Sequence, residues 1–219
     1  PDPNTYAVLP WRKNNGSATD RFICDIYKAD GSPFEGCPRF ILKKVLDEAN
    51  KMGYIYNTGP ELEFFMFPRD DNGQVKLENR GNGFYFTQPL DETYDIRRDI
   101  VAALEELGIE PEMSHTECAG DQHEIDFKYD TALKTADNAI TFRLVVKNIA
   151  NLYGYYATFM PKPIFGINGS GMHVHQSLFT KDGSQNAFYD ERDLYKLAAI
   201  AKSFVAGQLK YIKEIVAIT

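Results

Sequence analysis

The chain has 219 residues, of which 43% are hydrophobic and 25% charged, and its formal net charge is −7. This length allows one large domain or two small ones, and the acidic balance suits cation binding and argues against a nucleic-acid partner, which requires a basic surface. No stretch reaches the roughly 18 apolar residues of a membrane span, and three widely spaced cysteines favour reduced thiols in the cytoplasm.

The first third of the sequence predicts a hairpin, a helix and a buried strand. Two β-rich runs within residues 5–28, YAVLPW and RFICDIY, flank a polar turn, as in a hairpin. After a loop at 30–39, Pro38 can open a helix that Gly53 ends. Its expected apolar face consists of Phe40, Ile41, Val45, Leu46 and Ala49. A strand follows at 59–68, and then a polar loop or minor hairpin at 69–83.

The rest of the sequence alternates helices and strands. We expect helices over 92–107 and 131–153, and strands near 110–117 and 122–129 joined across AGD. Two further strands, YYATFM and MHVHQSLF, enclose the Gly-rich loop PKPIFGINGSG, and the last 28 residues have the pattern of one amphipathic helix. Several connections are too short for parallel crossovers, which favours an α+β fold with a mixed or antiparallel sheet and helices on one side.

The strand GPELEFFMF combines a buried aromatic run with two acids, Glu61 and Glu63. Side chains two residues apart on a strand point to the same face, roughly 7 Å apart. Two carboxylates at that distance repel by roughly 2–3 kcal/mol at an effective dielectric near 20. The strand therefore needs a source of positive charge to hold both acids.

Two other strands carry a similar pattern. Glu117 and Glu124 lie on the two strands joined by AGD, and His173 and His175 repeat the two-residue spacing. Taken singly, each pair is more often an exposed edge or a structural feature, and NGSG at 168–171 is either a turn or a set of amides facing an anion. If the three strands share one face, their carboxylates and imidazole suit a hard divalent cation, Mg²⁺ or Mn²⁺.

Three of these stretches resemble one enzyme family. KPIFGINGSGMHVHQS (162–177) is similar to the ATP-binding signature of glutamine synthetases, and GPELEFF and SHTECAGDQHEIDFKY are similar to their metal-binding strands. The bacterial type I form fits best, because PFEG, HEIDFKY and ATFMPKP also match it. The resemblance implies the fold of that family's catalytic domain, a curved, mostly antiparallel sheet with helices packed on its outer side.

The resemblance also implies a reaction and two ions. ATP phosphorylates the γ-carboxylate of glutamate, and ammonia then displaces phosphate to give glutamine. Glu63, Glu117 and Glu124 are the expected ligands of one divalent ion, and Glu61 and His173 those of the second, on the ATP phosphates. The expected ATP contacts are Glu112, Phe127, Lys128, Tyr129, His175 and Ser177. Asn168 and Gly169 are expected to contact the substrate glutamate.

The resemblance covers only part of the family's length. We therefore expect residues 1–28 to be the remnant of a small N-terminal domain and linker, and 29–219 to be a truncated catalytic domain that is inactive alone. The family forms cytoplasmic double hexameric rings, which this chain is not expected to build properly by itself. Two alternatives stay open: a ligase of the same family that uses another amine, and a homologue that has lost catalysis.

Overall fold

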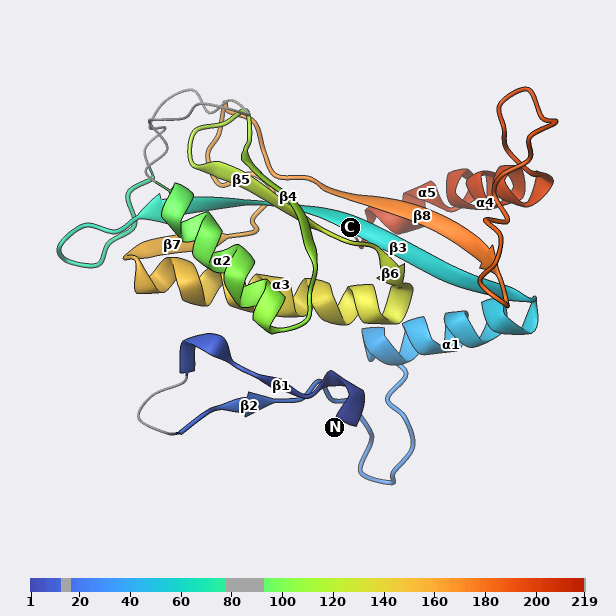
Figure 1. Ribbon diagram of the computed structural model, residues 1–219, viewed down its shortest axis with the longest axis horizontal. Helices are drawn as coiled ribbons and strands as arrows, with labels where there is room; N and C mark the ends of the chain where they lie inside the picture. Colours follow the sequence, from blue (N-terminus) through green and yellow to red (C-terminus); the bar gives the residue numbers. More distant parts are fainter. Residues whose placement is uncertain (13–16, 78–92, 219) are drawn as a thin grey trace.

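The computed structural model describes residues 1–12, 17–77 and 93–218 (Figure 1). Two short 3-10 helices lie at Pro3–Thr5 and Pro10–Arg12. The strands are β1 (Ala7–Val8), β2 (Asp20–Arg21), β3 (Tyr54–Pro68), β4 (Pro111–Thr116), β5 (Gln122–Phe127), β6 (Asp130–Thr131), β7 (Tyr155–Thr158) and β8 (Met172–Thr180). The helices are α1 (Pro38–Lys51), α2 (Tyr94–Glu106), α3 (Ala132–Leu152), α4 (Ala199–Lys210) and α5 (Ile212–Val216).

The long strand β3 is the centre of the main sheet. Along one edge it pairs with β5 and β6, and β4 lies outside β5; β7 and β8 share the opposite edge. All of these pairings are antiparallel, and α2 and α3 lie on one side of the sheet (Figure 1). The predicted α+β fold with a mostly antiparallel sheet is therefore confirmed.

The two faces of β3 pack against different parts of the chain, because side chains alternate along a strand. Leu62, Phe64 and Met66 point into the main core, together with buried residues of α2 and α3 such as Ile100 and Phe142. Phe65 and Phe67 point to the opposite face, where they form a second cluster with Ala119 and with partly buried Val75, Ile164 and Ile167. Glu61 and Glu63 share this second face.

The predicted elements are largely present, with shifted ends. β3 begins at Tyr54 rather than residue 59, because residues 54–58 also pair with β8. The described part of the 69–83 segment makes a small turn with a bridge between Arg69 and Val75; residues 78–83 lie outside the described residues. The hairpin predicted at 5–28 is present but short, with Ala7 paired to Arg21.

The predicted C-terminal helix is wrong in its extent. Helix α4 begins only at Ala199, and Tyr211 separates it from α5. The Asp193 carboxylate accepts hydrogen bonds from the backbone N–H groups of Tyr195 (3.0 Å) and Leu197 (3.3 Å), and Lys196 has a φ of 59°. Such side-chain bonds compete with helical ones, so this segment turns instead of extending the helix. The predicted end at Thr219 lies outside the described residues.

The predicted apolar face of α1 is also partly wrong. Ile41 and Val45 are 48% and 51% exposed, and α1 has no fully buried residue. The predicted Phe40, Leu46 and Ala49 are half-buried, and so is Leu42, which was not predicted. None of the described helices has the length and apolar character needed to cross a membrane.

The N-terminal segment is tied to α1 and α3 by one arginine. Arg39 contacts Asp137 of α3 at 2.9 Å, Asp25 at 2.8 Å and Asp2 at 2.6 Å, and its side chain is only 11% exposed. Lys43 adds a second contact to Asp25 at 2.7 Å. Hydrogen bonds from these cations hold the pKa of Asp2 and of Asp25 below its ordinary value. Charge pairing therefore fixes the segments around Asp2 and Asp25 against α1 and α3.

Candidate functional site

The acidic face of β3 continues across its neighbours. Glu63 lies directly opposite Glu124 on β5, and Glu124 lies opposite His115 on β4. On the other edge of β3, Glu61 lies opposite His173 of β8. Directly opposed residues on antiparallel strands project to the same face. The sheet register therefore brings Glu61, Glu63, Glu124 and His173, four of the predicted metal ligands, together on one surface.

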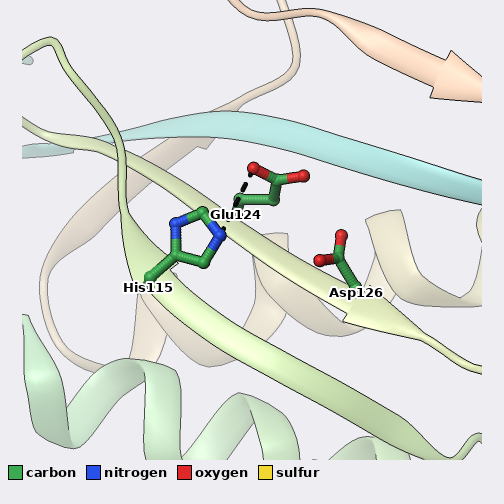
Figure 2. A group of neighbouring side chains, drawn as sticks. All are labelled: His115, Glu124 and Asp126. Atoms are coloured by element: carbon green, nitrogen blue, oxygen red, sulfur yellow. Dashed lines mark ion pairs between the residues drawn. The ribbon is translucent and has the colours of Figure 1, made fainter. Parts of the chain in front are cut away.

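Glu117, the fifth predicted ligand, reaches the same group through His115. The imidazole Nδ1 lies 3.4 Å from Glu117 Oε1, and Nε2 lies 3.5 Å from Glu124 Oε2. Figure 2 shows His115 from β4 beside Glu124 and Asp126 from β5. One potential ligand atom of each of these three residues lies within 4.8 Å of the others. The result is a buried group of carboxylates around a single imidazole.

Burial and mutual repulsion shift the acidities of this group. Burial raises the pKa of Glu124, and its neighbours Glu117 and Asp126 raise it further. Burial likewise raises the pKa of Asp126, and the charge of Glu61 adds to the effect. Burial is the main cause of the raised pKa of Glu63. Each shift disfavours the ionised carboxylate, as expected where like charges meet in a poorly solvated place.

The second predicted ligand pair is more open. Glu61 is 31% exposed in its side chain, and His175 Nε2 is bonded to Glu61 Oε1. A Cβ added to Gly171 would lie 3.2 Å from Glu63 Oε1 and 3.3 Å from His173 Nε2. Gly171 therefore leaves a small space that Glu63 and His173 both border, and a larger residue would fill it.

These residues fit divalent cations. The carboxylates of Glu63, Glu124 and Asp126 have raised pKa values, Glu117 lies beside them, and Asp126 Oδ1 is buried without a hydrogen-bond partner among the described residues. Oxygen-rich donor sets with one or two imidazoles suit Mg²⁺ or Mn²⁺. A cation here would supply the positive charge that the acids lack.

A cavity of about 260 Å³ is bordered by His175, the residue hydrogen-bonded to Glu61. Its lining includes three of the predicted ATP contacts, Tyr129, His175 and Ser177, together with Gly59. A Cβ on Gly59 would lie 3.1 Å from Tyr129 Cβ, so the glycine lets Tyr129 pack closely over the strand. The structure thus brings half of the predicted nucleotide contacts to one hollow.

The other predicted ATP contacts are placed differently. Phe127 is 3% exposed and packs against Phe142 in the main core, so its side chain points away from the acidic face. Lys128 is exposed, and its Nζ lies 3.1 Å from Glu110. Glu112 sits at an irregularity where β4 shifts register against β5. Phe127 could therefore contact a nucleotide only through its backbone.

The loop predicted to bind glutamate reaches the acids through Gln122. Gly169 O accepts a hydrogen bond from Gln122 Nε2 at 3.0 Å, and the same nitrogen donates to Glu63 Oε2 at 2.8 Å. Asn168 is exposed at the loop surface. Gly169 packs so tightly on Pro161 that an added Cβ would lie 2.3 Å from Pro161 O. A side chain at this position would displace the loop.

Three residues of this region were not among the predicted site residues: His115, Asp126 and Gln122. Two of them could have been found, because Gln122, Glu124 and Asp126 alternate along β5 and so share a face. This alternation was the available signal. His123 is consecutive with Glu124 on β5 and lies on the opposite face, 1% exposed, with Nδ1 3.2 Å from Arg97.

Comparison with known proteins gives a consistent result. Residues 35–219 match the family described as glutamine synthetase, catalytic domain. The chain is 52% identical over 220 residues to the glutamine synthetase of Clostridium saccharobutylicum, covering 100% of this chain and 49% of that protein. It is 52% identical over 219 residues to that of Methanosarcina mazei, covering 100% and 48%.

A solved structure described as a GmaS/ADP complex is similar with a TM-score of 0.83 at 31% identity, covering 100% of this chain and 49% of that one. The chain spans about half the length of the curated relatives that it matches.

Proposed function

We propose, from the premise that this chain belongs to the glutamine synthetase family, that it carries the metal- and nucleotide-binding part of a glutamate–ammonia ligase. In that reaction ATP phosphorylates the γ-carboxylate of L-glutamate to give ADP and γ-glutamyl phosphate, and ammonia displaces phosphate to give L-glutamine. Because the chain spans about half of its relatives, the whole reaction is proposed for a polypeptide that includes this chain.

The observation that carries the proposal is the continuous row of ligands across the sheet. Glu63 and Glu124 are direct cross-strand neighbours, and Glu117 joins them through His115. This grouping supports Glu63, Glu117 and Glu124 as the ligands of one ion. Glu61 opposite His173 supports the second pair.

Divalent ions held there would neutralise oxygen charge on the transferring phosphoryl group and on the glutamate carboxylate. This chain's residues would fix where those oxygens lie. Tyr129, His175 and Ser177 line the hollow proposed for the nucleotide, with Glu112, Lys128 and the Phe127 backbone proposed at its rim. The Asn168–Gly169 segment is proposed to bind glutamate. Gln122 donates hydrogen bonds to both Gly169 O and Glu63 Oε2, so this segment lies close to Glu63.

Ammonia is the amine that the comparisons favour. The relatives at 52% identity are named glutamine synthetases. By the same family membership we propose a cytoplasmic enzyme that assembles as a double hexameric ring, with 1–28 belonging to a small domain and linker and 29–219 to the catalytic domain. Light scattering on a polypeptide that includes this chain would measure the number of subunits.

Metal and nucleotide binding test the proposal directly on the 219-residue chain. We expect calorimetry at neutral pH to detect Mn²⁺ binding, and equilibrium dialysis to detect ADP binding that requires Mn²⁺. Glu48→Gln on the exposed side of α1 is the matched control and should bind as the wild type does. A folded chain that takes up no Mn²⁺ would contradict the proposed site. We also expect no γ-glutamyl hydroxamate from this chain alone, so its formation would contradict the expectation of inactivity.

A further inference from the structure

One buried amide bridges the acidic row and the Gly-rich loop. Gln122, the first residue of β5, is 1% exposed. Its Nε2 donates to Glu63 Oε2 at 2.8 Å and to Gly169 O at 3.0 Å, and lies 3.5 Å from Ser170 Oγ. The two acceptors belong to segments more than a hundred residues apart in the chain. Gln122 is therefore a direct physical link between a carboxylate of β3 and the loop at 161–171.

The orientation of the amide is fixed by its partners. A carboxylate oxygen and a carbonyl oxygen can only accept hydrogen bonds, so the NH₂ end must face them. The other end, Oε1, accepts from the backbone N–H of Ala119 at 3.3 Å. Both N–H groups and the oxygen of the side chain are thus engaged.

The backbone of Gln122 is held as firmly as its side chain. Its carbonyl accepts from Glu117 N at 2.8 Å, and its N–H donates to Ala119 O at 3.3 Å. The preceding residue, Asp121, has a φ of 62°, a left-handed conformation that is uncommon outside glycine. The tight turn at 117–122 therefore aims Gln122 at Glu63 while it positions Glu117 beside the same group.

We propose that Gln122 is a positioning residue that couples metal binding at Glu63 to the order of the loop at 161–171. Because Gln122 occupies Glu63 Oε2, the other oxygen, Oε1, is left facing the space beside Gly171 and His173. The same amide donates a hydrogen bond to Gly169 O. If Glu63 moves on binding a cation, Gln122 moves with it and shifts the loop at Gly169. This inference rests on the proposed function, since it assumes that Glu63 is a ligand and that the loop binds substrate.

The substitution Gln122→Met tests the coupling. Methionine has a similar volume but no hydrogen-bonding amide, so the buried space stays filled. Loss of the partner that orients a ligand typically lowers metal affinity 10- to 100-fold, and we expect a decrease of about tenfold in Mn²⁺ affinity by calorimetry. In hydrogen–deuterium exchange, Mn²⁺ should slow amide exchange at 161–171 in the wild-type chain and should leave it unchanged in the variant.

Two further variants sharpen the test. Gln74→Met makes the same replacement on an exposed turn and should behave as the wild type. Gln122→Leu removes both N–H donors without adding a charge beside Glu63, so it should also lose the Mn²⁺-dependent loop protection. It provides the measurement if the methionine variant does not fold.

The possible failures are distinct. Normal Mn²⁺ affinity together with normal loop protection in both Gln122 variants would overturn the coupling and leave the proposed metal site intact. A variant that is merely less stable to urea, with Mn²⁺ still protecting the loop, would assign Gln122 a structural role and would also overturn it. A wild-type chain that binds no Mn²⁺ would overturn the proposed site and, with it, this inference.

Discussion

Replacing Glu124 by glutamine removes one negative charge from the most crowded part of the site and keeps the shape of the side chain. Glu124 is 7% exposed and lies directly opposite Glu63. Opposed residues on antiparallel strands have Cβ atoms about 5 Å apart, and two charges at about 5.5 Å repel by about 3 kcal/mol at an effective dielectric near 20. We therefore expect the metal-free variant to be about 2–3 kcal/mol more stable than the wild type at pH 7.5.

The sign of this effect depends on pH in a predictable way. Burial and the neighbours Glu117 and Asp126 raise the pKa of Glu124 above its ordinary value of 4.5. Below pH 4.5 the residue is neutral in both the folded and the unfolded chain, so glutamine gives no advantage. As the pH rises through 4.5 towards the higher pKa of the folded state, the wild type loses stability and the variant does not.

Urea unfolding followed by circular dichroism in EDTA, at pH 4.5 and pH 7.5, measures both effects. Glu48→Gln on the exposed side of α1 is the control for loss of a carboxylate and should change little. Saturating Mn²⁺ should reverse the order, because an ion that binds only the folded chain stabilises it by mass action, and the variant lacks the proposed metal ligand Glu124. A Glu124→Gln variant that is less stable than the wild type in EDTA at pH 7.5 would refute the idea of crowded carboxylates.

Three further predictions concern separate features. Glu63→Gln should weaken Mn²⁺ binding at the first site more than Glu61→Gln does, measured by calorimetry; equal losses would show that the ligands are divided differently. Gly171→Ala should lower Mn²⁺ affinity without unfolding the chain, because its Cβ would enter the space beside Glu63 at 3.2 Å, and unchanged affinity would argue against a cation there. Arg39→Met should cost about 3 kcal/mol in urea unfolding, as for a broken buried ion pair, and should make residues 1–28 sensitive to protease; Arg98→Met, whose pairs are exposed, is the control with little expected change.

The shared face of the candidate metal ligands was largely readable from the sequence because side chains on a strand alternate every two residues. The spacing of Glu61 and Glu63 within an aromatic run placed both acids on one face, and the same rule applied to His173 and His175. The structure adds the register that joins the strands, Glu63 to Glu124 and Glu61 to His173. Register depends on which strands pair and on the turns between them, and no local pattern in this chain specified it.

Other features depend on contacts that a sequence pattern does not encode. Asp193 lies in a stretch with the pattern of an amphipathic helix. Its carboxylate instead accepts hydrogen bonds from the backbone of the following turn, and α4 begins only at Ala199. The helical periodicity likewise predicted that Ile41 faces the buried side of α1, but the packing of the folded chain leaves Ile41 exposed.

The stability of β3 explains how the fold can hold a row of acids before any cation binds. Phe64, Phe65, Met66 and Phe67 are all 0% exposed, and full burial of such a side chain contributes roughly 1.5–3 kcal/mol. Together these four side chains outweigh a carboxylate repulsion of about 3 kcal/mol. They also lie on both faces of the strand, so β3 is held from two sides immediately next to Glu63. The strand that carries the acids is therefore fixed by its own aromatic end, and we expect metal removal to lower the stability of the chain without unfolding it.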